Sequence, residues 1–395
     1  MRQAFLYRLY LNETQSDKLE NLLHLARQLY NAALQQRRDA WNYQHKSLNY
    51  YYQANQLKEV RNEIPEFMQL NFSATQDMLR RLDKSFKAFF RRVKNGDKAG
   101  FPRFKGRNRF DSITFPTYGD GIKVKGNHLY VQNVGQLKIK MHRTLVGEIN
   151  TATIKRECGK WYVVFSNTVE IEPLPVSDKI VGIDVGLNSF AVTSDGEFIA
   201  NPRYLRETQR ELRVAQRSVS RKKQGSHNRH KAGKLLAKKH LHVKRQRADF
   251  AHKVADNLVK VYGNIAVEDL KIKNMKRNHH LALSISDAGW GQFLSILAYK
   301  AEYAGREFIQ VNPDGTSQRC SRCGATVLKT LSVRIHHCPC CGLTIDRDLN
   351  SALEIKRLGL SLWDSTCASG QCVSQKLSAL ADRVVTYTKA LDQLN

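Results

Sequence analysis

The spacing of apolar residues along the first hundred positions predicts one strand and two helices. Residues 3–11 alternate between apolar and polar positions, which is the period of a half-buried strand. Over residues 19–34 the apolar positions recur every three or four residues, as in an amphipathic helix, and Thr14 with Asp17 resembles its capping signal. A second helix is predicted over residues 73–96, where an Asn-Gly pair ends it. We expect its aromatic residues to lie in the core, namely Phe86, Phe89 and Phe90.

Beyond residue 100 the period becomes that of strands. Short apolar runs separated by Gly-containing turns continue to about residue 165 and predict a small antiparallel barrel or sandwich. Two prolines at 173 and 175 indicate a linker, after which strands alternate with helices, so the second half reads as α/β. The elements expected there are a strand hairpin at Ile180–Val192 closed by the turn 194–196, two basic helices broken near Gly225, a buried strand at Asn264–Val267, a helix near Asp287–Ala304 and a helix from Asp348.

Composition adds one unusual property, a strongly basic charge. The 395 residues, of which 42% are hydrophobic, are enough for two or three globular domains. The first 25 residues carry charges throughout and no uncharged apolar run reaches about 18 residues, so we expect a cytoplasmic protein. A formal net charge of +28 repels itself unless a polyanion neutralises it, which makes nucleic acid the expected partner.

Two segments concentrate the candidate contacts to nucleic acid. Residues 201–250 contain 16 Lys or Arg against three acidic residues, with few acidic partners at helical spacing; the alternative is a solvated helical face. The loop 100–110 interleaves aromatic and basic residues, which lets rings stack on bases while cations meet phosphates; the alternative is a hydrophobic anchor. The candidate contacts are Phe101, Arg103, Phe104, Lys105, Arg107, Arg221, Lys222, Lys223, Lys238 and Lys239.

Carboxylates in apolar surroundings predict a metal site. Asp184 interrupts an apolar strand, where an unpaired carboxylate would cost several kcal/mol, so it needs a cation or an arginine partner. A second apolar strand ends in Glu268 and Asp269, which strand alternation places on opposite faces, so one of them can join Asp184. A third acidic residue from the segment 346–348 would complete a cluster for Mg²⁺ or Mn²⁺. Paired ions of this kind activate water for phosphodiester hydrolysis.

The third carboxylate is one of two aspartates. Asp348 stands at the start of a predicted helix, whereas Asp346 lies in the segment that leads to it. A metal ligand must be held to within about 0.5 Å, which favours the residue on the rigid element. We therefore assign Asp348 to the metals, and Asp346 to a structural hydrogen bond or to Arg347.

The cysteines predict a structural zinc site. A Cys-x₂-Cys pair, 14 residues and a second Cys-x₂-Cys pair are typical of tetrahedral Zn²⁺ with four thiolates, and free buried cysteines are the alternative. Within the second pair Cys340, His336 and His337 compete, but the spacing favours the outer two cysteines. The expected ligands are Cys320, Cys323, Cys338 and Cys341. Such a site would fix a loop of low hydrophobic content and deliver the following aspartate to the other carboxylates.

A competing metal motif is set aside. His240-Leu-His242 matches the His-hydrophobic-His pair of rolling-circle and transposase nucleases. Those histidines must project together from a strand, whereas here they lie in a predicted helix, in which positions i and i+2 point apart.

These motifs, in this order, resemble the TnpB or OrfB family of bacterial insertion sequences, relatives of the type V CRISPR effectors. The segments that carry the resemblance include Gly100–Lys105, Gly182–Gly186, Val267–Leu270, Leu283–Trp290, the two Cys pairs and Asp346–Asn350. The resemblance implies a multidomain α/β protein that cuts double-stranded DNA next to a short target-adjacent motif under a transposon-encoded guide RNA. It implies the catalytic triad Asp184, Glu268 and Asp348.

The resemblance also implies a domain plan. A wedge β-barrel would comprise residues 1–10 and 99–174, interrupted by a helical recognition domain at 11–98. An RNase H-like RuvC nuclease domain would follow at 175–358, with a zinc ribbon inserted at about 316–345 and a tail at 359–395 that we expect to be largely dispensable. The alternatives are a cleavage-dead repressor, which an intact carboxylate set argues against, and an unguided transposase or resolvase-type nuclease.

Overall fold

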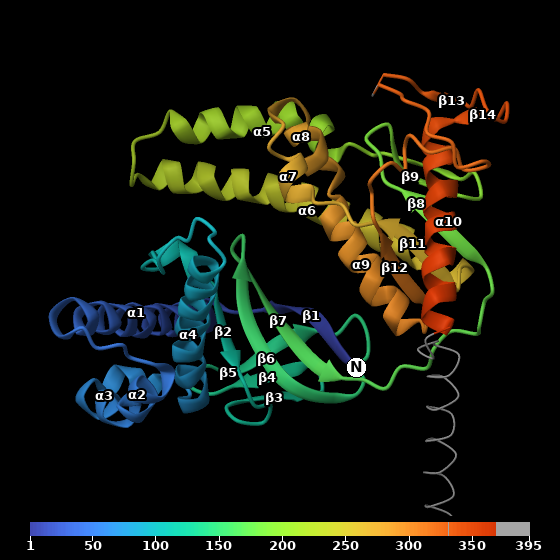
Figure 1. Ribbon diagram of the computed structural model, residues 1–395. Helices are drawn as coiled ribbons and strands as arrows, with labels where there is room; N and C mark the ends of the chain where they lie inside the picture. Colours follow the sequence, from blue (N-terminus) through green and yellow to red (C-terminus); the bar gives the residue numbers. More distant parts are fainter. Residues whose placement is uncertain (331, 369–395) are drawn as a thin grey trace, which may run out of the picture. The chain divides into compact units, whose positions relative to one another are not determined.

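The structure is a computed structural model that describes residues 1–330 and 332–368. The chain divides into two compact units, residues 1–170 and the residues from Ile171 onward, each with its own sheet (Figure 1). The expected α/β architecture with more than one domain is confirmed. Within the described ranges, no helix has the length and apolar character needed to cross a membrane.

The first unit is built on a seven-stranded antiparallel sheet in the order β2-β6-β7-β1-β5-β4-β3. Its N-terminal strand β1 lies in the middle, paired with β7 on one side and β5 on the other, although β5 and β7 follow more than 120 residues later. The strand predicted at residues 3–11 is thereby confirmed. The strands are β1 Arg2–Tyr10, β2 Ser112–Phe115, β3 Ile122–Lys125, β4 His128–Val131, β5 Gly135–Lys140, β6 Glu148–Glu157 and β7 Lys160–Thr168.

Four helices lie between β1 and β2 in the chain. The two that were predicted are present, and the short ones in between were not foreseen. The cap of the first helix differs from the prediction, because Asn12 accepts from the backbone of Gln15 at 2.8 Å and the Gln15 side chain returns the bond, forming a capping box. The helices are α1 Glu13–Gln44, α2 Tyr50–Asn55, α3 Leu57–Glu63 and α4 Phe72–Lys94, with short 3₁₀ turns η1 Pro65–Gln69 and, after α4, η2 Arg107–Arg109.

The expectation that the aromatic residues of α4 lie in the core is wrong for the second half of the helix. Met78 and Leu82 in the first half are buried, but Phe90 is 58% exposed and Phe86 and Phe89 are only partly buried. The periodicity identified the apolar face correctly. The elements that cover this face, α1, α2 and β2, leave the last turns of α4 partly open.

The second unit is built on a mixed five-stranded sheet in the order β10-β9-β8-β11-β12. β8, β11 and β12 are parallel, and β9 and β10 follow as antiparallel neighbours. A separate two-stranded sheet, β13-β14, belongs to the cysteine segment. The strands are β8 Ile180–Asp184, β9 Ser189–Thr193, β10 Phe198–Ala200, β11 Asn264–Glu268, β12 Glu307–Val311, β13 Ile335–His337 and β14 Thr344–Asp346.

The two basic helices and the buried strand were predicted at their observed places. The helix expected at 287–304 is interrupted, because Gly289 adopts a left-handed conformation (φ 70°) that ends α8 and starts α9. The turn 194–196 joins β9 to β10, and not the two strands of the first hairpin. The helices are α5 Tyr204–Ser220, α6 His227–Val261, α7 Ile272–Met275, α8 His279–Ala288, α9 Trp290–Tyr303 and α10 Arg347–Ala368.

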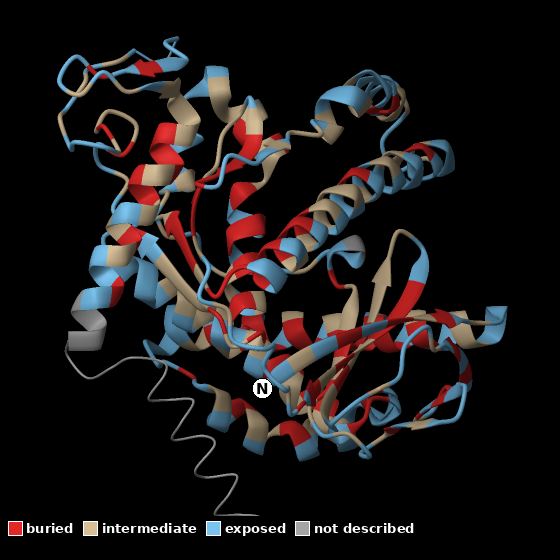
Figure 2. Cartoon of the chain, turned by 90° about the vertical axis from the view of Figure 1, so that its right-hand side faces the viewer, coloured by how far each residue is buried: buried red, intermediate tan, exposed pale blue. Residues whose placement is uncertain are grey.

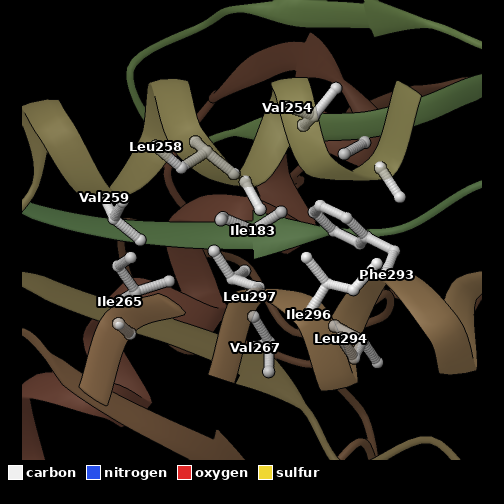
Figure 3. Close-up of a cluster of buried hydrophobic side chains, with 14 of the residues drawn as sticks. Ile183, Val254, Leu258, Val259, Ile265, Val267, Phe293, Leu294, Ile296 and Leu297 are labelled. Atoms are coloured by element: carbon white, nitrogen blue, oxygen red, sulfur yellow. The ribbon is translucent and has the colours of Figure 1, made fainter. Parts of the chain in front are cut away.

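Helices cover the central strands β8 and β11 of this sheet on both faces. On one face Ile183 and Val267 pack with α6 and α9 residues such as Leu258 and Phe293 in a large buried cluster (Figure 3). On the other face α10 contributes Ile355 and Trp363. The buried residues, red in Figure 2, gather in the strands and on the helix sides that face them. Strand alternation therefore assigns each β8 and β11 side chain to one of two helical layers.

Helix α10 lies unusually close to β8. A Cβ at Gly182 would lie 2.9 Å from the Cα of Lys356 and closer still to the carbonyl oxygen of Ala352, so only glycine fits at this position. One turn further along, Gly359 meets the side chain of Ala266 on β11. The predicted end of the nuclease domain, at residue 358, falls inside this helix, which continues to Ala368. Apolar positions at helical spacing predict one short helix over residues 377–385 of the remaining tail, which lies outside the described residues.

We expect Gly182→Ala to lower the free energy of unfolding by about 3 kcal/mol, because the added methyl group meets rigid helix backbone and cannot be relieved by a rotamer change. Urea unfolding followed by circular dichroism measures this. Gly233→Ala is the matched control: it lies in α6 with open space around it and should be neutral or stabilising by up to about 1 kcal/mol. Equal midpoints for the two variants would show that α10 does not pack directly on β8.

Candidate functional site

Two of the expected carboxylates lie side by side at the ends of adjacent parallel strands. β8 and β11 are paired in register up to the residue before Asp184 and Glu268 respectively, and adjacent strands lie about 4.8 Å apart. Both side chains face α10, since they follow Gly182 and Ala266 by two residues and those residues contact α10. Asp269 falls on the other side and is exposed, so Glu268 is the residue that accompanies Asp184.

The third carboxylate comes from the first turn of α10. Asp348 precedes Ala352 and Lys356 by one and two turns, so it belongs to the same stripe of the helix that rests on Gly182. Its Oδ2 lies 3.9 Å from the point that a Cβ at Gly186, just beyond β8, would occupy. The close contact between helix and strand therefore brings Asp348 to the end of β8, where Asp184 lies.

The pKa values of all three carboxylates are raised, mainly by burial. Burial raises the pKa of Asp184 well above its usual range, and the negative charges of Glu268 and Asp348 raise it further. Burial also raises the pKa of Glu268, although a hydrogen bond from the hydroxyl of Thr316 opposes this. The pKa of Asp348 is raised by burial and by Asp346. Partly buried like charges are stabilised by protons or by a cation, and the oxygen donor set is the one that Mg²⁺ and Mn²⁺ prefer.

The neighbouring aspartate has a structural role. Asp346 accepts hydrogen bonds from the backbone N–H groups of Asp348 at 2.8 Å and Leu349 at 3.1 Å, so its side chain caps α10. The structural hydrogen bond expected for Asp346 is therefore confirmed. Arg347, between the two aspartates, donates to the carbonyl oxygen of Thr330 at 3.1 Å and holds the cysteine segment against the helix start.

The four expected zinc ligands come together. The sulfur atoms of Cys320, Cys323, Cys338 and Cys341 all lie within 4.8 Å of one another, with 3.6 Å between Cys320 and Cys341 and 3.5 Å between Cys323 and Cys338. Tetrahedral zinc with Zn–S bonds of about 2.3 Å would separate its ligands by about 3.8 Å. The cluster therefore has the dimensions and the chemistry to hold zinc.

The two Cys pairs have the same backbone geometry. In each turn the N–H of a glycine, Gly324 or Gly342, donates to the carbonyl of the first cysteine at 2.9 Å, and both glycines have positive φ. Backbone N–H groups of Cys341 and Cys340 lower the pKa of Cys338 to about 6, which favours the thiolate form that binds metal. Cys340 contributes only backbone to the cluster, and its exposed side chain lies outside it.

Asn350 connects this cluster to α10. Its fully buried side chain donates to the carbonyl oxygen of Arg319 at 2.8 Å and accepts from the N–H of Ser321 at 3.0 Å, so it holds the backbone on both sides of Cys320. A salt bridge of 3.5 Å also joins Arg319 to the buried Glu354, which lies one turn after Asn350 on α10. Asn350 lies two residues after Asp348, so the first Cys pair and the third carboxylate are held by the same turn of helix.

Three residues near the carboxylates were missed in the sequence. Thr316 orients Glu268, Asn350 holds the first Cys turn, and Arg334 approaches Asp348 at 3.6 Å. With the Asn188 amide oriented to accept, Arg334 also donates to it at 2.6 Å. None of these residues has a spacing that distinguishes it from an ordinary polar position. The signal that could have found Thr316 and Asn350 is their polarity next to the cysteine motif and the final helix.

The expected nucleic-acid contacts lie in both units. In the first unit Phe101, Arg103, Phe104 and Arg107 are exposed and Lys105 is partly buried. In the second unit Arg221 and Lys223 are exposed and Lys222 partly buried at the turn between α5 and α6, and Lys238 is exposed on α6. Lys239 differs from the rest, because it donates to Glu211 on α5 at 2.5 Å.

The competing histidine motif is excluded by the helix that carries it. His240 and His242 lie in the middle of α6, at positions that point apart, and both are exposed. Among the residues that the structure describes, the four cysteines are the single group of three or more ligands whose atoms lie close enough together to hold one ion, and the three carboxylates are not gathered that tightly.

Comparison with known proteins assigns the family. Residues 153–279 match the OrfB_IS605 family model, described as "Probable transposase", and residues 290–355 match the Cas12f1-like TNB domain. Residues 1–46 match a helix-turn-helix model of the same family, although here they form strand β1 and one uninterrupted helix, α1.

The chain also aligns with two bacterial proteins over most of its length. One, from Streptomyces pristinaespiralis, is named as a candidate RNA-guided DNA endonuclease and is 32% identical over 94% of this chain and 92% of its own. The other, InsQ of Escherichia coli K12, is also named as a candidate RNA-guided DNA endonuclease. It is 30% identical over 90% of this chain and 92% of its own. A solved structure of the mini RNA-guided endonuclease CRISPR-Cas_phi3 shares the fold, with a TM-score of 0.51 at 9% identity over 91% of this chain and 92% of that one. The chain therefore belongs to the OrfB family of IS605-type elements, the TnpB proteins.

Proposed function

We propose that the protein is an RNA-guided endonuclease, encoded by a bacterial insertion sequence, that cuts double-stranded DNA next to a short target-adjacent motif. The observation that carries this proposal is the meeting of Asp184, Glu268 and Asp348 at the end of two parallel strands under one helix, with the pKa values of all three raised. The names of the two relatives that align over most of the chain support the guide RNA and the DNA substrate.

The second unit is the nuclease domain in this proposal. Its mixed sheet, with three parallel strands and two antiparallel neighbours, agrees with the RNase H-like RuvC arrangement that the family implies. The cysteine segment would be its zinc ribbon. The seven-stranded sheet of the first unit would be the wedge β-barrel, and α1–α4 the recognition domain inserted between its first two strands.

Each carboxylate has a definable part in hydrolysis. Divalent ions held by the three carboxylates would activate a water and stabilise the leaving oxygen. Asp184 stands at the strand end that both other groups approach. Glu268 is oriented by the hydroxyl of Thr316, and Asp348 is fixed by the cap of α10. The chain thereby holds three carboxyl oxygen donors in place before substrate arrives.

The alternatives fit these observations less well. A cleavage-dead repressor would have no need to keep three partly buried carboxylates whose charges repel one another. A strand-transferring transposase needs a module for its transposon ends, and the segment that matches a helix-turn-helix model is a strand and a single helix. An unguided resolvase leaves the first unit without a role.

We expect Asp184→Ala, Glu268→Ala and Asp348→Ala each to abolish Mg²⁺- or Mn²⁺-dependent cleavage of target DNA, while binding of RNA and DNA stays within about twofold. Guided cleavage and filter binding, measured on the same preparations, test this. Asp269→Ala is the matched control and should cleave as wild type. Asp346→Ala should lose a helix cap, about 1 kcal/mol, and keep a measurable fraction of activity. If Asp346→Ala is inactive and Asp348→Ala active, the metal ligand has been misassigned.

We expect the purified protein to contain one Zn²⁺ per chain, by elemental analysis. Cys338→Ser should lose the zinc and cleave at least about tenfold more slowly, because the segment that leads into Asp348 loses its anchor. Cys340→Ser should retain both zinc and activity, since its side chain lies outside the cluster. Zinc loss in the Cys340 variant would mean that the ligand set includes the wrong member of the second pair.

We expect Asn350→Ala to keep its zinc, since all four cysteines remain, but to need at least about threefold more Mg²⁺ for half-maximal cleavage. The reason is that Asp348 would lose its link to the Cys320 turn. Mg²⁺ titration of cleavage, together with zinc content, separates this positioning role from zinc binding. Asn350→Asp keeps the acceptor for Ser321 and should be intermediate. An unchanged Mg²⁺ requirement in both variants would contradict the link.

A further inference from the structure

Four phenylalanine rings form an exposed cluster where α4 meets the following loop. The cluster, which we call the phenylalanine platform, consists of Phe86, Phe89, Phe90 and Phe101. Phe101 lies edge-on to Phe86 and Phe89, with ring centroids 5.5 and 5.4 Å apart, and Phe90 lies 5.2 Å from Phe89. Phe90 is 58% exposed and Phe101 46% exposed. Rings that pack on one another while leaving this much surface open are typical of a binding surface.

The loop that carries Phe101 is held in place by the helix bundle. Asn31 on α1 accepts from the backbone N–H of Lys105 at 2.8 Å and donates to its carbonyl at 3.0 Å. Arg38 on the same helix places its guanidinium 5.3 Å from the ring centre of Phe104. The loop is therefore tied to α1 at two adjacent residues, Phe104 and Lys105, which restricts where Phe101 can lie.

The surroundings of the platform are strongly basic. Between residues 91 and 109 the chain has eight Lys or Arg and a single acidic residue, Asp97. The exposed cations include Arg91, Arg92, Lys94, Lys98, Arg103 and Arg107. Two such surfaces would repel each other, which argues against a second copy of the chain as the occupant. Apolar rings framed by cations are instead complementary to a polyanion that carries flat apolar groups.

We propose that the phenylalanine platform binds unpaired bases of the guide RNA by stacking, while the surrounding Arg and Lys residues neutralise the adjacent phosphates. Unpaired bases are required because the base faces inside a duplex are already covered by their neighbours. RNA is the favoured occupant, because the DNA substrate of the proposed function is double-stranded, so that its base faces are covered, whereas a guide RNA has unpaired bases to offer. This inference rests on the proposed function and names one place at which its RNA partner is held.

The test uses the full-length protein and a 12-nucleotide single-stranded RNA, with DNA of the same sequence and the RNA duplex as comparison probes. Phe90→Ala and Phe101→Ala should each weaken binding of the single-stranded RNA about tenfold and leave binding of the duplex unchanged. The dependence of affinity on salt should keep its slope, because no charge is removed. Arg91→Gln with Arg92→Gln should lower that slope by up to about 1.4, two phosphate contacts at about 0.7 each for a single strand.

Phe72→Ala is the matched control, since Phe72 is 44% exposed at the opposite end of α4 and lies outside the platform. An equal loss of RNA affinity in Phe72→Ala, or no loss in the platform variants, would overturn the inference. A larger loss for DNA than for RNA would make DNA the occupant, and dissociation of a dimer by Phe90→Ala in sedimentation would make it a second copy. Guided DNA cleavage by the wild-type protein is measured alongside. If the wild type does not cleave, the proposed function is contradicted. If it cleaves but the platform variants bind single-stranded RNA as tightly as the wild type, only this inference is contradicted.

Discussion

The candidate active site depends on a missing side chain. Because position 182 has no Cβ, helix α10 can lie with its backbone against strand β8 in place of being held off by a side chain layer. That contact determines how close α10 lies to the sheet and how the helix is oriented over it. Asp348 lies one turn before the contact on α10, and Asp184 lies two residues after it on β8. Asp184 and Asp348 are far apart in the sequence of the unit, and the distance between them is set by van der Waals contact between two backbones. Such a contact is among the stiffest constraints in a protein.

The cysteine cluster adds a second constraint on the same helix. Zinc ribbons have few apolar residues and take their order from the metal. Here the cysteine segment is joined to α10 by buried polar contacts, from Asn350 to the backbone around Cys320 and from Glu354 to Arg319. The helix is thus held by the sheet on its apolar side and by the cysteine segment at its start. A carboxylate that lies beside other carboxylates needs such support, because electrostatic repulsion alone would push it outward.

Much of this arrangement could be predicted because the residues involved would be energetically unfavourable in any other structural role. A carboxylate within an apolar strand, as at Asp184, has few structural explanations, and the cysteine spacing has even fewer. The periodicity after residue 348 placed Asp348 on a helix, and the hydrogen-bonding role of its neighbour Asp346 followed from the same argument.

The errors in the prediction have physical reasons as well. Periodicity gives the direction of an apolar face but not the length of the element that covers it, so Phe90 was taken as core. Short helices such as α2 contain too few turns for a period to be visible.

Between residues 346 and 350, four of the five side chains have separate places: Asp346 caps the helix, Arg347 contacts the cysteine segment, Asp348 belongs to the carboxylate site and Asn350 holds the Cys320 turn. Each residue added to an α-helix rotates everything beyond it by about 100°. An insertion or deletion of one residue here would therefore misdirect several contacts at once, and no single substitution could restore them. Chain length is consequently as constrained in this stretch as residue type. The turn at Gly126, which has open space around it in the first unit, carries no such restriction, and loops of that kind are where natural or engineered length variation can be accommodated.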